Sequence, residues 1–136
     1  LPQKAHARVI AGELAGVKGP LSAVAGSPLY ADITLERDGE ARVPLPKDHT
    51  AFAYIVEGAV MLPGSEQAFH AGRVLLFNRD GEAVALRTGK GGARYLLIAG
   101  APLGEPIAWH GPIVMNTEAE LKDAFRELQE GTFIRR

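Results

Sequence analysis

The sequence contains no cysteine among its 136 residues. This absence excludes disulfide bonds, thiolate metal sites and a thiol nucleophile. The sequence also has no large excess of positive or negative charge, because 15 Lys and Arg are balanced by 16 Asp and Glu, for a formal net charge of -1. The chain therefore lacks the basic excess that neutralises phosphates, and we expect no direct binding to nucleic acid.

Long apolar runs and a recognisable secretion signal are also missing. The longest apolar stretches, such as residues 52–56, are far shorter than a membrane-spanning helix. We therefore expect no membrane association, and a cytoplasmic location. The first residues are Leu1 and Pro2 instead of Met, which suggests a domain taken from a longer protein.

The motifs of common enzyme classes are absent from the sequence. It has no Gly-x-Ser-x-Gly elbow, no phosphate-binding loop and no dinucleotide fingerprint. The four histidines are His6, His49, His70 and His110, and no two lie within five residues of each other. Without a His-x-His or His-Glu-x-x-His pair, we expect neither a metal ligand nor a catalytic residue in this chain. The carboxylates Asp32 and Glu36 are expected to belong to an exposed charged face.

Short β-rich runs separated by turn residues occupy the chain up to about residue 100. The expected strands are residues 8–11, 29–35, 41–43, 51–56, 59–62, 73–77, 83–87 and 94–99. We expect a hairpin bend at Glu57 and Gly58, between the fourth and fifth of these strands. About eight strands at roughly ten-residue spacing are typical of an all-β sandwich or barrel.

The C-terminal segment changes to a helical pattern. Thr117 and Glu120 have the spacing of a capping box. The apolar residues at helical spacing are Leu121, Ala124, Phe125 and Leu128. Because Gly131 follows as a left-handed cap, the pattern predicts a helix over residues 117–130, with its apolar stripe packed on the barrel.

The segment before this helix, residues 101–116, is expected to be an extended connection. Gly111 and Pro112 set an extended turn, and Ile113 and Met115 point into a core. The helix is capped by its first residue, Thr117, or by the Asn116 that precedes it.

Four residues are candidates for lining a pocket. They are His49, Tyr54, Trp109 and His110. An aromatic side chain beside a titratable imidazole is a combination that ligand pockets use. The alternative is that Trp109 covers the edge of a core and that the barrel is filled by its own side chains.

Several segments together resemble a known family. Residues 45–58 and 69–77 resemble the two hairpins of cupin barrels, and residues 99–117 resemble the C-terminal signature of the pirin family. Residues 8–13 resemble the start of the C-terminal cupin domain of pirins, so that the similarity covers about residues 7–134. The signature positions, with expected structural roles, are Gly104, Glu105, Pro106, Gly111, Pro112, Asn116 and Thr117. The resemblance implies one domain over residues 1–136, a cupin-type double-stranded β-helix (jelly-roll) barrel with a C-terminal α-helix.

Pirins are bicupins, with two similar barrels in one chain. The resemblance implies that the metal is bound in the barrel that this sequence does not contain. In that family, iron or another divalent metal is bound by three His and one Glu of the N-terminal barrel, and some members have quercetinase-type dioxygenase activity. The equivalent His, His and Glu positions of this chain fall at about Pro44, Pro46 and Thr50, which are poor metal ligands. We therefore expect no cofactor in this chain and a metal in an N-terminal barrel that the sequence does not include. Leu1 and Pro2 resemble the link that follows that barrel.

Three hypotheses for function follow. In the first, the chain is a non-catalytic C-terminal cupin domain that packs against an N-terminal metal-binding cupin, and it also binds protein partners. In the second, it is part of a metal-dependent quercetin 2,3-dioxygenase-type enzyme whose active site lies in the absent barrel. In the third, it is a stand-alone cupin that binds a small ligand. The partner is the missing barrel or, in a homodimer, a second copy, and either case predicts an exposed apolar patch.

Overall fold

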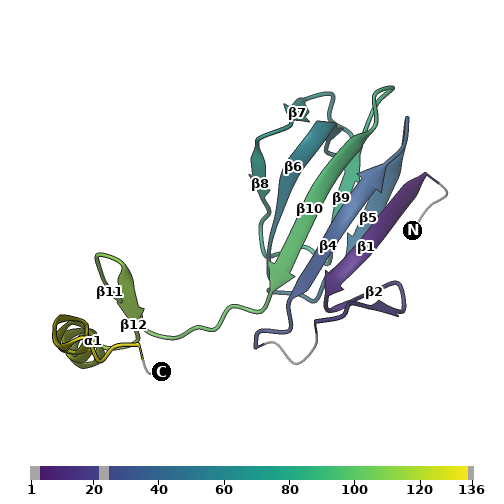
Figure 1. Ribbon diagram of the computed structural model, residues 1–136. Coiled ribbons are helices and arrows are strands. Elements are labelled where there is room, and N and C mark those ends of the chain that lie inside the picture. Colours follow the sequence, from purple (N-terminus) through teal and green to yellow (C-terminus); the bar gives the residue numbers. More distant parts are fainter. Residues whose placement is uncertain (1–3, 22–24, 135–136) are drawn as a thin grey trace. The chain divides into compact units, whose positions relative to one another are not determined.

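A computed structural model describes residues 4–21 and 25–134. Leu1 and Pro2, which were expected to resemble an interdomain link, lie outside the described residues. The chain forms two compact units, Leu1–Pro102 and Leu103–Arg136. The first unit contains strands β1–β10 (Figure 1), and the second contains the short β11–β12 hairpin and the helix.

The first unit is a curled antiparallel sheet, as the strand pattern predicts. Its strands, in spatial order, are β1 (Ala5–Ala11), β4 (Leu29–Leu35), β10 (Ala93–Gly100), β6 (Thr50–Met61), β9 (Ala83–Arg87) and β5 (Glu40–Pro44). Two short strands, β7 (Ala68–His70) and β8 (Val74–Leu76), pair with β6. A separate hairpin joins β2 (Glu13–Leu14) to β3 (Val17–Lys18). β4 and β9 have the bounds that the sequence predicts.

The interior of this unit is filled by apolar side chains. Alternate residues of each long strand point inward, which gives β10 a strict alternation of buried and half-buried positions. The largest fully buried side chains are Tyr95, Ile33, Leu35, Ile55, Leu86, Leu97, Val43 and Val60. Small barrels are commonly packed in this way, so the curled sheet encloses a core and not a ligand chamber.

The predicted hairpin bend at Glu57 and Gly58 is wrong. β6 continues through both residues as one strand of 12 residues. The disturbance that they cause is a bulge, because Tyr95 pairs with Ile55 while Arg94 pairs with Glu57 and leaves Val56 without a partner on β10. A bulge accommodates one extra residue and increases the local twist without ending the strand.

The second unit contains β11 (Ala108–His110), β12 (Ile113–Met115) and α1 (Glu118–Glu130). Residues 108–115, predicted as part of an extended connection, form a two-stranded hairpin. The apolar stripe of the helix packs on this hairpin. The buried residues of this second core are Ala108, Ile113, Leu121 and Ala124, with Met115 and Phe125 partly buried. Leu128 is exposed and does not belong to it.

The caps of α1 are those that the sequence predicts. The Thr117 hydroxyl accepts a hydrogen bond from the backbone N–H of Glu120, and the Glu120 carboxylate accepts one from the backbone N–H of Thr117. Gly131 ends the helix in the left-handed conformation, with φ 73°. Asn116 is not the cap, since its side-chain amide donates to the Glu105 carboxylate at 2.7 Å. No described helix is long and apolar enough to span a membrane.

Gly58, two residues after the bulged Val56, is a position on β6 that should tolerate substitution poorly. Its φ is 71°, and a Cβ at this position would press on the carbonyl oxygen of Gly92. Gly58→Ala is expected to lower the free energy of unfolding by about 3 kcal/mol, from the left-handed backbone and the forced displacement together. Denaturant titration followed by circular dichroism measures this loss.

Gly64 provides the matched control, because its φ is 75° and the space around its Cβ position is open. Gly64→Ala should lower the free energy of unfolding only by the backbone contribution, about 1 kcal/mol. Equal losses for the two variants would show that the close approach between Gly58 and Gly92 is unimportant.

Candidate functional site

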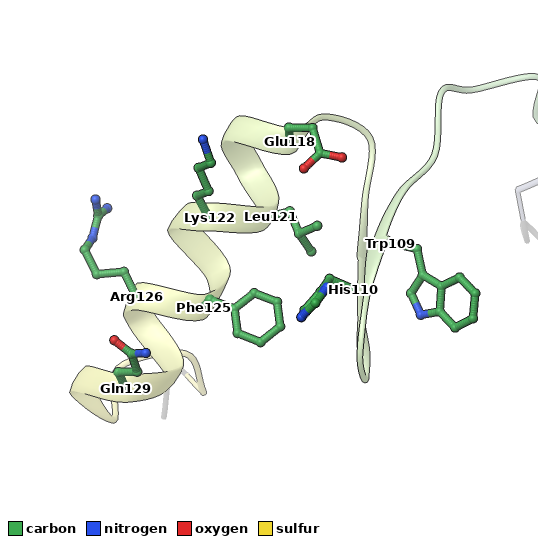
Figure 2. Close-up of a pocket in the computed structure, with 8 residues that line it drawn as sticks. All are labelled: Trp109, His110, Glu118, Leu121, Lys122, Phe125, Arg126 and Gln129. Carbon is green, nitrogen blue, oxygen red and sulfur yellow. The ribbon is translucent and has the colours of Figure 1, made fainter.

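The β11–β12 hairpin has two different faces. His110 lies toward α1, and its ring meets the ring of Phe125 edge-to-face at a centroid distance of 5.4 Å. Trp109 lies on the other side of the strand, away from α1, as Figure 2 shows. It pairs across the hairpin with Val114. Alternation along the strands therefore gives the hairpin one face packed on the helix and one outward face.

The outward face is apolar and exposed. Trp109 is 71% exposed and Val114 is 58% exposed. The Trp109 indole N–H donates to the carbonyl oxygen of Gly111 at 2.7 Å, which fixes the ring against the hairpin turn. We call the surface formed by Trp109 and Val114 the hairpin face. A large aromatic ring held in one position beside an aliphatic side chain is typical of protein-binding surfaces.

A groove of about 490 Å³ lies between β11 and the helix. Its lining residues, drawn in Figure 2, are Trp109, His110, Glu118, Leu121, Lys122, Phe125, Arg126 and Gln129. The cations Lys122 and Arg126 project from the helix surface, and Arg126 pairs with Asp123 at 2.9 Å. The groove is a shallow surface feature with exposed charges, and it suits contact with another protein surface better than enclosure of a small molecule.

The four predicted pocket residues do not form one pocket. His49 is half-buried and lines a cavity at one end of the β-unit, together with Pro44 and Pro46. Tyr54 points outward from β6, 39% exposed, and is paired with Val74. Trp109 and His110 belong to the second unit, where both line the groove described above, although their rings lie on opposite sides of β11.

The signature residues of the connection and the hairpin have local structural settings. Gly104 and Gly111 have positive φ, and Gly111 with Pro112 forms the turn between β11 and β12. Glu105 is joined to Asn116 by the hydrogen bond described above, which ties the connection to the start of α1. The structural roles expected for the signature residues stay a prediction.

The residues at the positions expected for metal ligands do not fit a metal. Pro44 and Pro46 have no side-chain donor, and Thr50 is a neutral hydroxyl at the start of β6. Within residues 4–21 and 25–134, no group of three or more His, Asp or Glu side chains could hold a metal ion. We therefore derive no chemical step through a metal in this chain.

An ion pair that sequence reasoning missed crosses the outer face of the sheet. The guanidinium of Arg94 on β10 donates two hydrogen bonds to the carboxylate of Asp32 on β4, at 2.9 and 2.7 Å. The hydrogen bonds from Arg94 hold the pKa of Asp32 below its usual value, and the positive charges of Arg94 and Arg8 act in the same direction. The two residues are 62 positions apart, so only knowledge of the strand pairing could have revealed the contact.

The chain is similar to known proteins along most of its length. Residues 30–134 match the family model described as the pirin C-terminal cupin domain. Pirin-1 of Arabidopsis thaliana is 37% identical over 126 residues, which are 90% of this chain and 43% of that protein. Pirin of Rattus norvegicus is 33% identical over 129 residues, covering 90% of this chain and 44% of the relative.

Among solved structures, a quercetin 2,3-dioxygenase from Acinetobacter baumannii matches with a TM-score of 0.84 and 31% identity. The match covers 98% of this chain and 45% of that structure. The predicted cupin fold is thereby confirmed. The chain spans about half the length of the curated relatives that it matches.

The Asp32–Arg94 pair predicts how the stability of the chain depends on pH. Because the pKa of Asp32 is lower in the folded state than its ordinary 3.8, the charged carboxylate stabilises the fold above pH 3.8. This contribution should be lost as the pH falls from 3.8 through the lower pKa of the folded state. Asp32→Asn should reduce the free energy of unfolding by about 1 kcal/mol at pH 7.

The measurement is denaturant unfolding of both proteins between pH 2 and pH 7. The difference between wild type and Asp32→Asn should be largest at neutral pH and should shrink toward pH 2. A difference that stays constant with pH would contradict the role of the ion pair. Asp123→Asn, in the exposed pair with Arg126, serves as the control and should change stability little.

Proposed function

This chain belongs to the pirin C-terminal cupin domain family, and on that premise we propose that it is a non-catalytic structural half that packs against an N-terminal metal-binding cupin. The observation that carries the proposal is the exposed hairpin face. Trp109 and Val114 form an apolar surface that no part of their own hairpin or helix covers. Such a surface is stabilised when a partner removes it from water.

The composition of the whole second unit supports a docking role. Beyond the hairpin face, its exposed large apolar side chains are Leu103, Ile107, Leu128, Phe133 and Ile134. Its buried core contains only four residues. A segment with more exposed than buried large apolar side chains is poorly stabilised on its own, and it is well suited to form an interface.

The proposed occupant of the hairpin face is the other cupin half found in proteins of this family. The chain accounts for 43–51% of the length of the first three curated relatives, so each of them has room for a second barrel of similar size. We propose that iron or another divalent metal belongs to that second barrel. The absence of suitable donors at Pro44 and Pro46 supports this division of roles.

The dioxygenase hypothesis is a second candidate and concerns the two halves together. It is favoured by the 31% identity to the quercetin 2,3-dioxygenase structure from Acinetobacter baumannii. In that case, this chain stabilises the enzyme through packing and contributes no metal ligand. Self-association as a homodimer, other protein partners and a cytoplasmic location remain predictions.

The docking proposal is tested by calorimetric titration of this chain with the part of the Acinetobacter baumannii protein that lies outside the 45% match. We expect saturable one-to-one binding. Trp109→Ser and Val114→Ser should each weaken it at least about tenfold, because truncation of a buried anchor costs more than about 1.4 kcal/mol.

Val74→Ser is the matched control. Val74 lies on β8 and is 57% exposed, close to the value for Val114, but it belongs to the other unit. The control should bind like the wild type. Binding that is unaffected by Trp109→Ser and Val114→Ser, or a concentration-dependent dimer that these variants abolish, would contradict the proposed occupant.

A further inference from the structure

An open cleft of about 630 Å³, which we call the cavity, lies at one end of the β-unit and includes neither Asp32 nor Arg94. Its walls come from residues 12–21 and 27–29, which lie between β1 and the start of β4, and from residues 44–49, which run from the end of β5 toward β6. The lining residues are Gly12, Glu13, Lys18, Gly19, Leu21, Ser27, Pro28, Leu29, Pro44, Leu45, Pro46 and His49. This volume is typical of sites for small organic molecules.

The walls of the cavity are held by backbone hydrogen bonds. The N–H of Gly19 donates to the carbonyl oxygen of Gly12 at 2.9 Å. The N–H of Leu45 donates to the backbone carbonyl oxygen of Glu82 at 2.9 Å. Pro28, Pro44 and Pro46 restrict the backbone further, since the φ of proline is fixed. A site with walls already ordered loses little conformational entropy when a ligand enters.

The side chains around the cavity combine an apolar wall with few charges. The leucines and prolines provide the apolar part. Lys18 is paired with Glu13 in the register of β2 and β3, but within residues 4–21 and 25–134 its ammonium forms no ion pair. The Lys18 ammonium and the His49 imidazole therefore remain able to donate hydrogen bonds to a ligand.

From this arrangement we propose that the cavity binds a small organic carboxylate with an apolar body. Lys18 and His49 hold the carboxylate, and the leucine and proline wall covers the apolar body. Pro44 and Pro46 occupy the positions where the cupin pattern would place metal ligands. A metal would need side-chain donor atoms there, whereas the prolines offer apolar surface that can contact an organic molecule. This site is separate from the docking role and does not depend on it.

The probe is 2-naphthoate, with 2-naphthylmethanol as its neutral counterpart of similar shape. Each is titrated into the ¹⁵N-labelled chain and followed by amide chemical shifts. We expect saturable shifts confined to the lining segments, including Gly12, Gly19 and His49. The carboxylate should bind about tenfold more tightly than the alcohol, as one charge-assisted hydrogen bond allows.

Three substitutions test the charges and the cavity itself. Lys18→Met keeps the aliphatic stem and should abolish the preference for the carboxylate, whereas Glu13→Gln should strengthen carboxylate binding about twofold to threefold by removing a like charge. Leu21→Trp, at a side chain that is 55% exposed, should fill the cavity and weaken both probes. Lys90→Met removes a lysine outside the cavity and should have no effect.

The proposal is overturned by an absence of saturable shifts, by shifts concentrated outside the lining segments, or by equal affinity of the wild type for the two probes. A Lys90→Met variant that loses the preference as fully as Lys18→Met would also overturn it. Lys18→Met should leave calorimetric docking through Trp109 and Val114 unchanged, so the two proposals fail or succeed separately.

Discussion

The filling of the curled sheet by its own side chains is the constraint on which the rest of the molecule depends. Alternation along β4, β6 and β10 places Ile33, Ile55 and Leu97 in one interior, and all three are completely buried. A close-packed interior has no room for a substrate, and its buried polar side chains, Tyr95 and Thr88, carry neutral hydroxyls that are poor metal ligands. Any function of the chain must therefore use its surfaces or the cavity at the end of the β-unit.

The β11–β12 hairpin of the second unit has one face that packs on α1 and another face that is exposed. Ile113 completes a small core with α1, while Val114, the next residue, is exposed beside Trp109. The period of two that belongs to any strand separates these faces without a larger fold. The partner that we propose for the hairpin face is the remaining part of such proteins, because the relatives in the pirin C-terminal cupin family are about twice as long as this chain.

Local sequence patterns predicted elements of the fold, but they could not predict contacts between residues far apart in the sequence. The bounds of β4 and β9 and the Thr117 capping box follow from alternation and capping chemistry, which act over a few residues. The bulge at Val56 could not be distinguished from a hairpin bend, since a glycine after a glutamate is compatible with both and the partner strand decides. The charged contact between Asp32 and Arg94 and the separation of the predicted pocket residues likewise depend on strand order, which the sequence does not show directly.

The central claim is that this pirin C-terminal cupin domain carries out no metal chemistry of its own. The most direct measurement is elemental analysis of the purified, dialysed chain by mass spectrometry, combined with an assay for quercetin oxidation in air with Fe²⁺ supplied. The account predicts far less than one metal ion per chain and no turnover above the protein-free rate. Close to one metal ion per chain, lost on substitution of His49, or turnover by the 136-residue chain would contradict it.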